Sequence, residues 1–169
     1  MKIAICGYSG SGKSTLAGKI SEKEQIPVLY LDTVQFVNNW QERDREEAKA
    51  MVKAFMEQKN WVIDGNYTNF FYQERMEEAD RILILAFHRC SCFYRALKRY
   101  IRYRNKTRES MAEGCKEKFD LEFMLWILWT GRTKERRERF TQLQNKYPEK
   151  VIVLKNQRQL DAYYQRFLI

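Results

Sequence analysis

The segment G-Y-S-G-S-G-K-S, residues 7–14, constrains the fold of this chain more than any other part of its sequence. An apolar run, Ile-Ala-Ile-Cys at residues 3–6, precedes it, and Leu16, Ala17 and Ile20 follow at the spacing of one helix face. The pattern predicts a buried strand, a glycine-rich turn and then a helix. A chain that begins in this way is expected to build an α/β domain around a parallel sheet.

Each residue type in this segment suits the binding of phosphate. Glycine permits positive φ angles and lets backbone N–H groups approach phosphate oxygens closely. Lys13 supplies a charge for the β- and γ-phosphates and Ser14 a hydroxyl for Mg²⁺, at the positive N-terminal end of the following helix. We therefore expect ATP and Mg²⁺ as cofactors, with the nucleotide held by Gly7, Ser9, Gly10, Ser11, Gly12, Lys13, Ser14 and Thr15. The alternative is a glycine-serine turn that binds nothing.

The composition is that of a folded globular protein. The residues are 44% hydrophobic and 31% charged, and only two are prolines. A length of 169 residues is enough for one domain with a hydrophobic core. We expect that domain to cover residues 1–169, with a lid-like helical region at about 89–139. The start of the chain lacks the pattern of a signal peptide and the longest apolar run, residues 123–129, is far shorter than a membrane span, so we expect a cytoplasmic protein without a membrane partner.

Strand patterns alternate with helix patterns along the rest of the chain. After residues 3–6, strands are expected at 27–31, 61–63, 81–87 and 151–154, and helices at 41–58, 70–79, 91–105, 120–146 and 157–168. The predicted fold is a three-layer α/β P-loop NTPase fold, with a five-stranded, mostly parallel sheet and a helical lid insertion. Ligands of such sheets gather at the carboxyl ends of the strands.

Two carboxylates follow expected strands. Asp64 comes after the strand at 61–63 and Asp32 after the strand at 27–31. A carboxylate near Mg²⁺ and a γ-phosphate either holds the metal's water shell or accepts a proton from an attacking hydroxyl. We assign the metal role to Asp64, together with Ser14, and the acceptor role to Asp32. The alternatives are a turn residue at Asp64, which precedes glycine, and a helix cap or turn residue at Asp32.

Basic residues concentrate after the fourth strand. Eight basic and no acidic residues lie between Arg89 and Arg108, in a chain whose net charge is +9. On a helix, Arg95, Lys98, Arg99, Arg102 and Lys106 share one face, and Phe93, Leu97, Tyr100 and Ile101 share the opposite face, which we expect to pack against the protein. A second basic cluster contains Arg132, Lys134, Arg136, Arg137 and Arg139. We expect Arg95, Arg99 and Arg136, with Lys13 and Asp32, to be catalytic, because arginines neutralise charge during phosphoryl transfer. The alternative is solvated surface charge.

The four cysteines are expected to be reduced thiols that serve packing. His88, Cys90, Cys92 and Cys115 offer four ligand types suited to zinc. The spacing H-x-C-x-C lacks the gap of two to four residues that lets a cysteine pair bind zinc from one turn, so packing is the favoured interpretation.

Several segments resemble a known family. Residues 7–15 (GYSGSGKST), residues 61–67 (WVIDGNY) and the arginine-rich helices resemble the adenylate-kinase-like branch of P-loop kinases. More narrowly, residues 31–40 (LDTVQFVNNW) and 115–127 (CKEKFDLEFMLWI), with residues 61–67, look like the topology modulation (FlaR-like) proteins over nearly the whole chain. The resemblance implies that Asp64 lies beside magnesium and that Asp32 is the acceptor-side acid. The chain lacks the Pro-Arg pair that grips a phosphate-bearing acceptor in nucleoside monophosphate kinases, which favours a hydroxyl acceptor.

These observations predict an ATP-dependent phosphotransferase that acts on a small-molecule phosphate acceptor, a nucleoside or nucleotide among the candidates. The family resemblance leaves a second hypothesis, a nucleotide-dependent DNA-binding protein that uses the basic stripe. The sequence contains no helix-turn-helix, zinc-finger or RNA-binding motif, so nucleic acid is not the favoured partner. An NTPase without an acceptor is the third hypothesis.

Overall fold

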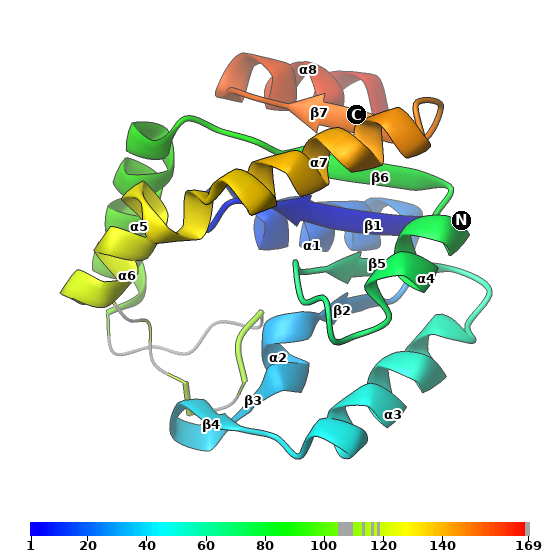
Figure 1. Ribbon diagram of the computed structural model, residues 1–169, viewed down its shortest axis with the longest axis horizontal. Helices are drawn as coiled ribbons and strands as arrows, with labels where there is room; N and C mark the ends of the chain where they lie inside the picture. Colours follow the sequence, from blue (N-terminus) through cyan, green and yellow to red (C-terminus); the bar gives the residue numbers. More distant parts are fainter. Residues whose placement is uncertain (105–109, 113, 116, 118, 168–169) are drawn as a thin grey trace.

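A five-stranded parallel sheet forms the centre of the computed structural model, which describes residues 1–104, 110–112, 114–115, 117 and 119–167 (Figure 1). The strand order is β2-β5-β1-β6-β7, and every pair in the sheet is parallel. The strands are β1 (Lys2–Gly7), β2 (Val28–Tyr30), β5 (Trp61–Asp64), β6 (Arg81–Leu85) and β7 (Val151–Leu154). The predicted five-stranded sheet is confirmed, and β1 lies at its centre.

Helices cover both faces of the sheet and complete the three layers. Successive residues of β1 point to opposite faces, so Ile3 and Ile5 belong to one hydrophobic cluster and Ala4 and Cys6 to the other. The first cluster includes side chains of α1 (Lys13–Glu24), α5 (Arg89–Tyr103), α6 (Leu121–Leu128) and α8 (Gln157–Phe167). The second includes side chains of α2 (Leu31–Gln35), α3 (Arg45–Met56), α4 (Tyr72–Glu78) and α7 (Lys134–Lys146). Figure 1 shows α7 in front of the sheet and α1 behind it.

A small hairpin replaces the start of the helix expected at 41–58. β3 (Phe36–Val37) and β4 (Gln41–Glu42) pair antiparallel across a short 3-10 turn, η1 (Asn38–Trp40). α3 begins only at Arg45 because the Asp44 side chain accepts hydrogen bonds from the N–H groups of the first helical turn. This hairpin extends from the edge of the sheet beside Asp32.

The prediction of a single helix at 120–146 is wrong. The structure has two helices there, α6 and α7, separated by the 3-10 turn η2 (Thr130–Arg132). Gly131 lies so close to Trp126 that an added Cβ would stand 2.5 Å from the Trp126 carbonyl oxygen. The Thr133 side chain then accepts a hydrogen bond from the Arg136 N–H and starts α7. The break divides the expected long helix into two shorter ones.

The prediction of which face of α5 packs against the protein is also partly wrong. Cys92 and Ala96 are the buried residues of this helix, whereas Ile101 is 68% exposed. Small side chains are needed on the inner face because α5 lies against the glycine-rich loop, where an added Cβ on Gly10 would stand 2.4 Å from the Cys92 carbonyl oxygen. Arg95 and Arg99 are consequently half-buried beside this inner face.

None of the described helices combines the length and the apolar character that crossing a membrane requires.

Candidate active site

The loop between β1 and α1, residues 7–14, has the backbone that its glycines predict, and we call it the P-loop. Gly10 and Gly12 have φ angles of 78° and 99°, a region that side-chain-bearing residues rarely adopt. Gly7 is also required, because a Cβ there would stand 2.4 Å from the Leu85 carbonyl oxygen of β6. The loop is closed by a hydrogen bond from the Ser11 N–H to the Tyr8 carbonyl oxygen at 3.2 Å.

Lys13 and Ser14 begin α1 beside the carboxyl end of β5. The Ser14 hydroxyl donates a hydrogen bond to Asp64 Oδ2 at 2.7 Å, and Lys13 Nζ donates to the Tyr8 carbonyl oxygen at 3.3 Å. Asp64 reaches this position because it pairs in register with Ile5 of the neighbouring β1. A hydroxyl and a buried carboxylate that meet at the mouth of the loop are the hard oxygen donors that suit Mg²⁺. These two residues would hold the ion, which would supply charge neutralisation to a bound polyphosphate.

Asn66 supports the P-loop from outside it and was not among the residues predicted for the site. Its side chain accepts a hydrogen bond from the Gly7 N–H at 3.0 Å and donates one to the Gly7 carbonyl oxygen at 2.7 Å. The amide of Asn66 therefore satisfies both backbone groups of the first P-loop residue. The signal in the sequence was its place directly after Asp64-Gly65, at the carboxyl end of a strand.

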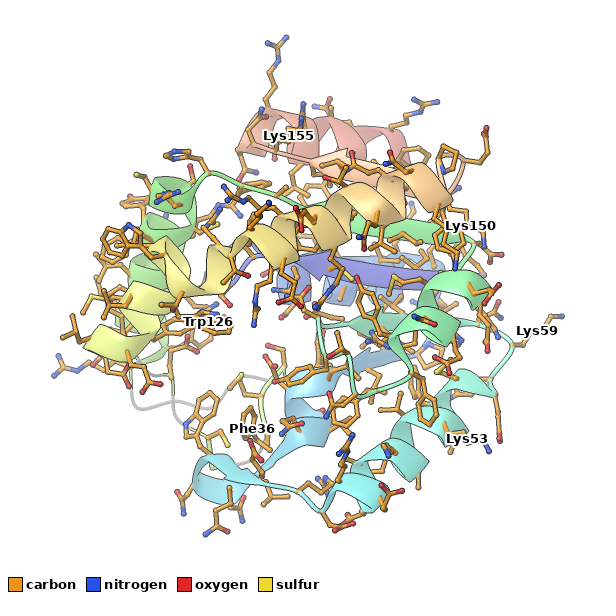
Figure 2. The ribbon with its side chains drawn as sticks, in the orientation of Figure 1. Phe36, Lys53, Lys59, Trp126, Lys150 and Lys155 are labelled. Carbon is orange, nitrogen blue, oxygen red and sulfur yellow. The ribbon has the colours of Figure 1, made fainter. Side chains whose placement is uncertain are left out.

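A cavity of about 750 Å³ opens at this edge of the sheet. It brings together most of the predicted site residues: its wall includes Ser9, Gly10, Lys13, Ser14, Asp32, Asp64, Arg99 and Arg136. Gly7, Ser11, Gly12 and Thr15 belong to the described part of the chain but lie outside that wall: the first three are part of the P-loop, and Thr15 is an exposed residue of α1. Aromatic side chains form much of the remainder, and Figure 2 shows two of them, Trp126 and Phe36, on opposite sides of the opening between α6 and β3.

Asp32 is the second residue of α2, the short helix that directly follows β2. Its Oδ1 accepts a hydrogen bond from the Tyr67 hydroxyl at 2.7 Å, and both residues line the cavity. Burial, followed by the charge of Asp32, raises the pKa of the Tyr67 phenol, which therefore stays protonated and remains a donor. The pair places a carboxylate with a fixed orientation opposite the P-loop.

Arg75 fixes the loop that carries Asn66 and Tyr67. Its side chain is fully buried, and it donates from Nη1 to the Gly65 carbonyl oxygen at 3.3 Å, from Nη2 to that of Tyr67 at 2.7 Å and from Nε to that of Phe70 at 2.7 Å. Burial lowers the pKa of this guanidinium. The wall of the cavity that includes Gly65 and Tyr67 is thus held by one buried side chain.

The cationic residues of the cavity wall differ in their partners. Arg99 forms an ion pair with the buried carboxylate of Glu117, with 2.5 Å between Nε and Oε1. Arg139 pairs with Glu135 one turn earlier on α7, at 3.1 Å. The Arg136 guanidinium lies 4.3 Å from the centre of the Trp126 ring, and burial, followed by the charge of Arg139, lowers its pKa. Within the described part of the chain, Arg136 is therefore held by an aromatic ring rather than by an ion pair with a carboxylate.

Arg95 lies behind the P-loop and is not part of the cavity wall. Its Nη1 donates to the Ser11 carbonyl oxygen at 2.6 Å, Nη2 donates to Gln157, and its guanidinium covers the Phe87 ring at 4.5 Å. The structure thus gives Arg95 contacts that support the loop from outside. Its predicted catalytic role stays a prediction.

The cysteine and histidine side chains considered for zinc have separate surroundings. Cys92 Sγ lies 3.2 Å from Arg132 Nη2, whereas Cys115 Sγ contacts the backbone of Val37 and Trp40. His88 caps the start of α5. Within the described ranges, no three His, Cys, Asp or Glu side chains gather to hold a metal ion.

Comparisons with known proteins give a likeness of fold. No protein-family model matches the sequence, and no curated protein sequence matches it. A solved Thermus thermophilus protein has 15% identity and a TM-score of 0.51, with 99% of this chain and 97% of that chain covered. Shikimate kinase from Bacteroides thetaiotaomicron has 19% identity and a TM-score of 0.48, with 98% and 95% covered. Deoxyadenosine kinase from M. mycoides has 17% identity and a TM-score of 0.47, with 98% and 97% covered. The strand order and the likeness to the Thermus thermophilus structure support the predicted three-layer α/β fold around a five-stranded parallel sheet.

Proposed function

We propose that this protein is an ATP-dependent kinase that transfers the γ-phosphoryl group of Mg·ATP to a hydroxyl group of a small molecule. One observation carries the proposal: the P-loop, the Ser14–Asp64 pair, Asp32 and the cations Arg99 and Arg136 all face one cavity. These are the parts that phosphoryl transfer uses, namely a phosphate cradle, oxygen donors for a metal, a carboxylate for the acceptor and charge for the transition state.

Each part has a defined step in the transfer. The P-loop binds the nucleotide phosphates, and Asp32 accepts the proton of the acceptor hydroxyl as its oxygen attacks the γ-phosphorus. The bond between the γ-phosphorus and the bridging oxygen breaks, and ADP leaves with that oxygen's negative charge. Lys13 and Arg136 stabilise the charge that develops on the phosphoryl oxygens.

The proposal is tested by ADP release from the full-length protein with Mg·ATP and a panel of nucleosides, nucleoside monophosphates and sugars. We expect release that depends on one class of acceptor, is lost on chelation of Mg²⁺ and yields a phosphorylated product visible by ³¹P NMR. Absence of nucleotide binding by calorimetry would contradict the proposal.

A nucleotide-dependent DNA-binding function, as the resemblance to topology modulation proteins suggests, is the second candidate. The observation in its favour is the exposed pair Lys98 and Arg102 on the outer side of α5. Kinase function is favoured because Arg99 and Arg136 face the cavity instead.

A further inference from the structure

Trp126 joins three parts of the site through separate contacts. Its indole Nε1 donates a hydrogen bond to Ser9 Oγ of the P-loop at 3.1 Å. Its ring carries the Arg136 guanidinium of α7 at 4.3 Å from the ring centre. Gly131 in the turn between α6 and α7 fits around it, since a Cβ there would stand 3.0 Å from Nε1. Trp126 is half-buried and lines the cavity (Figure 2).

These contacts use both chemical properties of the indole. Its single N–H donates a hydrogen bond to the P-loop, and its electron-rich face attracts the Arg136 guanidinium. A partly buried indole N–H needs an acceptor in any case; here that acceptor belongs to the P-loop, and the ring face also carries an arginine. The contacts connect the P-loop to one cation of the opposite wall.

Arg136 differs in one respect from the other two arginines of the wall. Arg99 pairs with Glu117 and Arg139 with Glu135, but among the described residues no carboxylate lies within ion-pair distance of Arg136. A guanidinium against a ring face keeps its N–H donors at its edge. The edge of Arg136 is therefore available to an anion in the cavity.

We propose that Trp126 is a positioning residue that makes the site prefer a nucleoside triphosphate to a diphosphate. It holds Arg136 where the terminal phosphate enters and fixes Ser9 at the same end of the P-loop. A diphosphate lacks the group that Arg136 would contact, so the contribution of the Trp126–Arg136 stack is confined to the triphosphate. This inference rests on the proposed function, because it places ATP in the cavity.

The experiment compares the binding of Mg·AMPPNP, a triphosphate analogue, with that of Mg·ADP by calorimetry on the full-length protein. Trp126→Leu is expected to lower the affinity for the triphosphate by about ten- to a hundredfold, because one charge-assisted contact is lost. The affinity for the diphosphate should fall by about threefold or less. Trp129, on the same segment but 57% exposed, offers the matched control: Trp129→Leu should bind both nucleotides as the parent does.

Two further variants separate the contacts. Arg136→Gln should reproduce the selective loss, and adding it to Trp126→Leu should cost little more, because both changes remove the same interaction. Trp126→Phe keeps a ring for Arg136 but removes the donor to Ser9, so it should match Ser9→Ala and retain most of the preference.

Three outcomes would overturn the inference. The first is an equal loss of affinity for both nucleotides in Trp126→Leu, which would make Trp126 a structural support only. The second is a Trp126→Leu protein that binds both nucleotides as the parent does. The third is an unaltered preference in Arg136→Gln, which decides the question even where Trp126→Leu fails to fold. A parent protein that binds neither nucleotide contradicts the proposed function itself, which distinguishes that failure from this one.

Discussion

The side-chain amide of Asn66 forms two hydrogen bonds with the backbone of Gly7: its Oδ1 accepts from the Gly7 N–H at 3.0 Å, and its Nδ2 donates to the Gly7 carbonyl oxygen at 2.7 Å. The pair joins the end of β5 to the beginning of the P-loop. The position of the P-loop therefore depends on a residue outside it.

Asn66→Ala should lower both stability and nucleotide affinity. It leaves two partly buried backbone groups of Gly7 without their partner, a loss of about 1–3 kcal/mol in the free energy of unfolding. Thermal unfolding with and without Mg·ATP measures both effects. Asn145→Ala, at an exposed position of α7 outside the cavity wall, is the control. A melting temperature equal to that of the control would show that the amide bonds are dispensable.

Lys13→Ala should abolish phosphoryl transfer and preserve the fold, because Lys13 contacts the Tyr8 carbonyl at the loop mouth rather than the core. Turnover should fall by about a hundredfold or more, as expected for loss of a charge that acts on the transition state. Steady-state ADP release and circular dichroism give the two readouts. Lys23→Ala, exposed on the same helix, should retain full turnover. Parent-like activity of Lys13→Ala would mean that the loop is not catalytic.

Asp64→Asn should raise the Mg²⁺ concentration needed for half-maximal turnover by about tenfold, because a neutral amide replaces a buried carboxylate at the proposed metal position. Ser14→Ala should move the same titration in the same direction, since the two side chains meet at 2.7 Å. The measurement is ADP release against free Mg²⁺. An unchanged titration in Asp64→Asn would return this residue to a structural role in the turn.

Tyr67→Phe should lower transfer to a hydroxyl acceptor and leave ATP hydrolysis by water nearly unchanged. The phenol orients Asp32 through one hydrogen bond, and a hydrogen bond to a charged group contributes about 1.5–3 kcal/mol, or roughly ten- to a hundredfold in kcat. In an Asp32→Asn background the same change should have little further effect. Tyr94→Phe, at an exposed position, is the matched control. Equal losses in transfer and hydrolysis would refute an acceptor-side role.

The basic residues of α5 should differ in their effect on turnover according to whether they face the cavity or the solvent. Arg99→Ala should lower turnover by about ten- to a thousandfold, whereas the exposed pair Lys98→Ala, Arg102→Ala should leave turnover unchanged. For a DNA-binding protein, removing that pair would instead reduce the salt dependence of duplex binding by about two units. Fluorescence anisotropy with a labelled duplex at several salt concentrations, beside ADP release, separates the two functions.

The sequence predicted the parts of this protein that depend on short-range patterns. The alternation of strand and helix patterns predicted the sheet, and the spacing of Gly7, Gly12, Lys13 and Ser14 predicted the P-loop. Both depend on residues that are close together in the sequence. Asp32 and Asp64 were placed at the cavity because parallel strands end at one edge.

Contacts between distant segments were not predictable in this way. The face of α5 was misassigned because hydrophobicity favoured Ile101, whereas close approach to Gly10 requires the small side chains of Cys92 and Ala96. The break near Gly131 depends on Trp126 occupying the space that a side chain there would need. Neither requirement has a signal in the periodicity of one helix.

Arg75 also determines how this site can be redesigned. Its three hydrogen bonds hold the carbonyl groups of residues 65, 67 and 70, and only a planar fork of N–H donors reaches all three from one buried position. A lysine at position 75 could not replace it. Residues 65–70 therefore cannot be transplanted from another scaffold as a loop alone: any graft that reshapes this wall of the cavity must carry α4 with it, so that loop and helix are exchanged as one cassette.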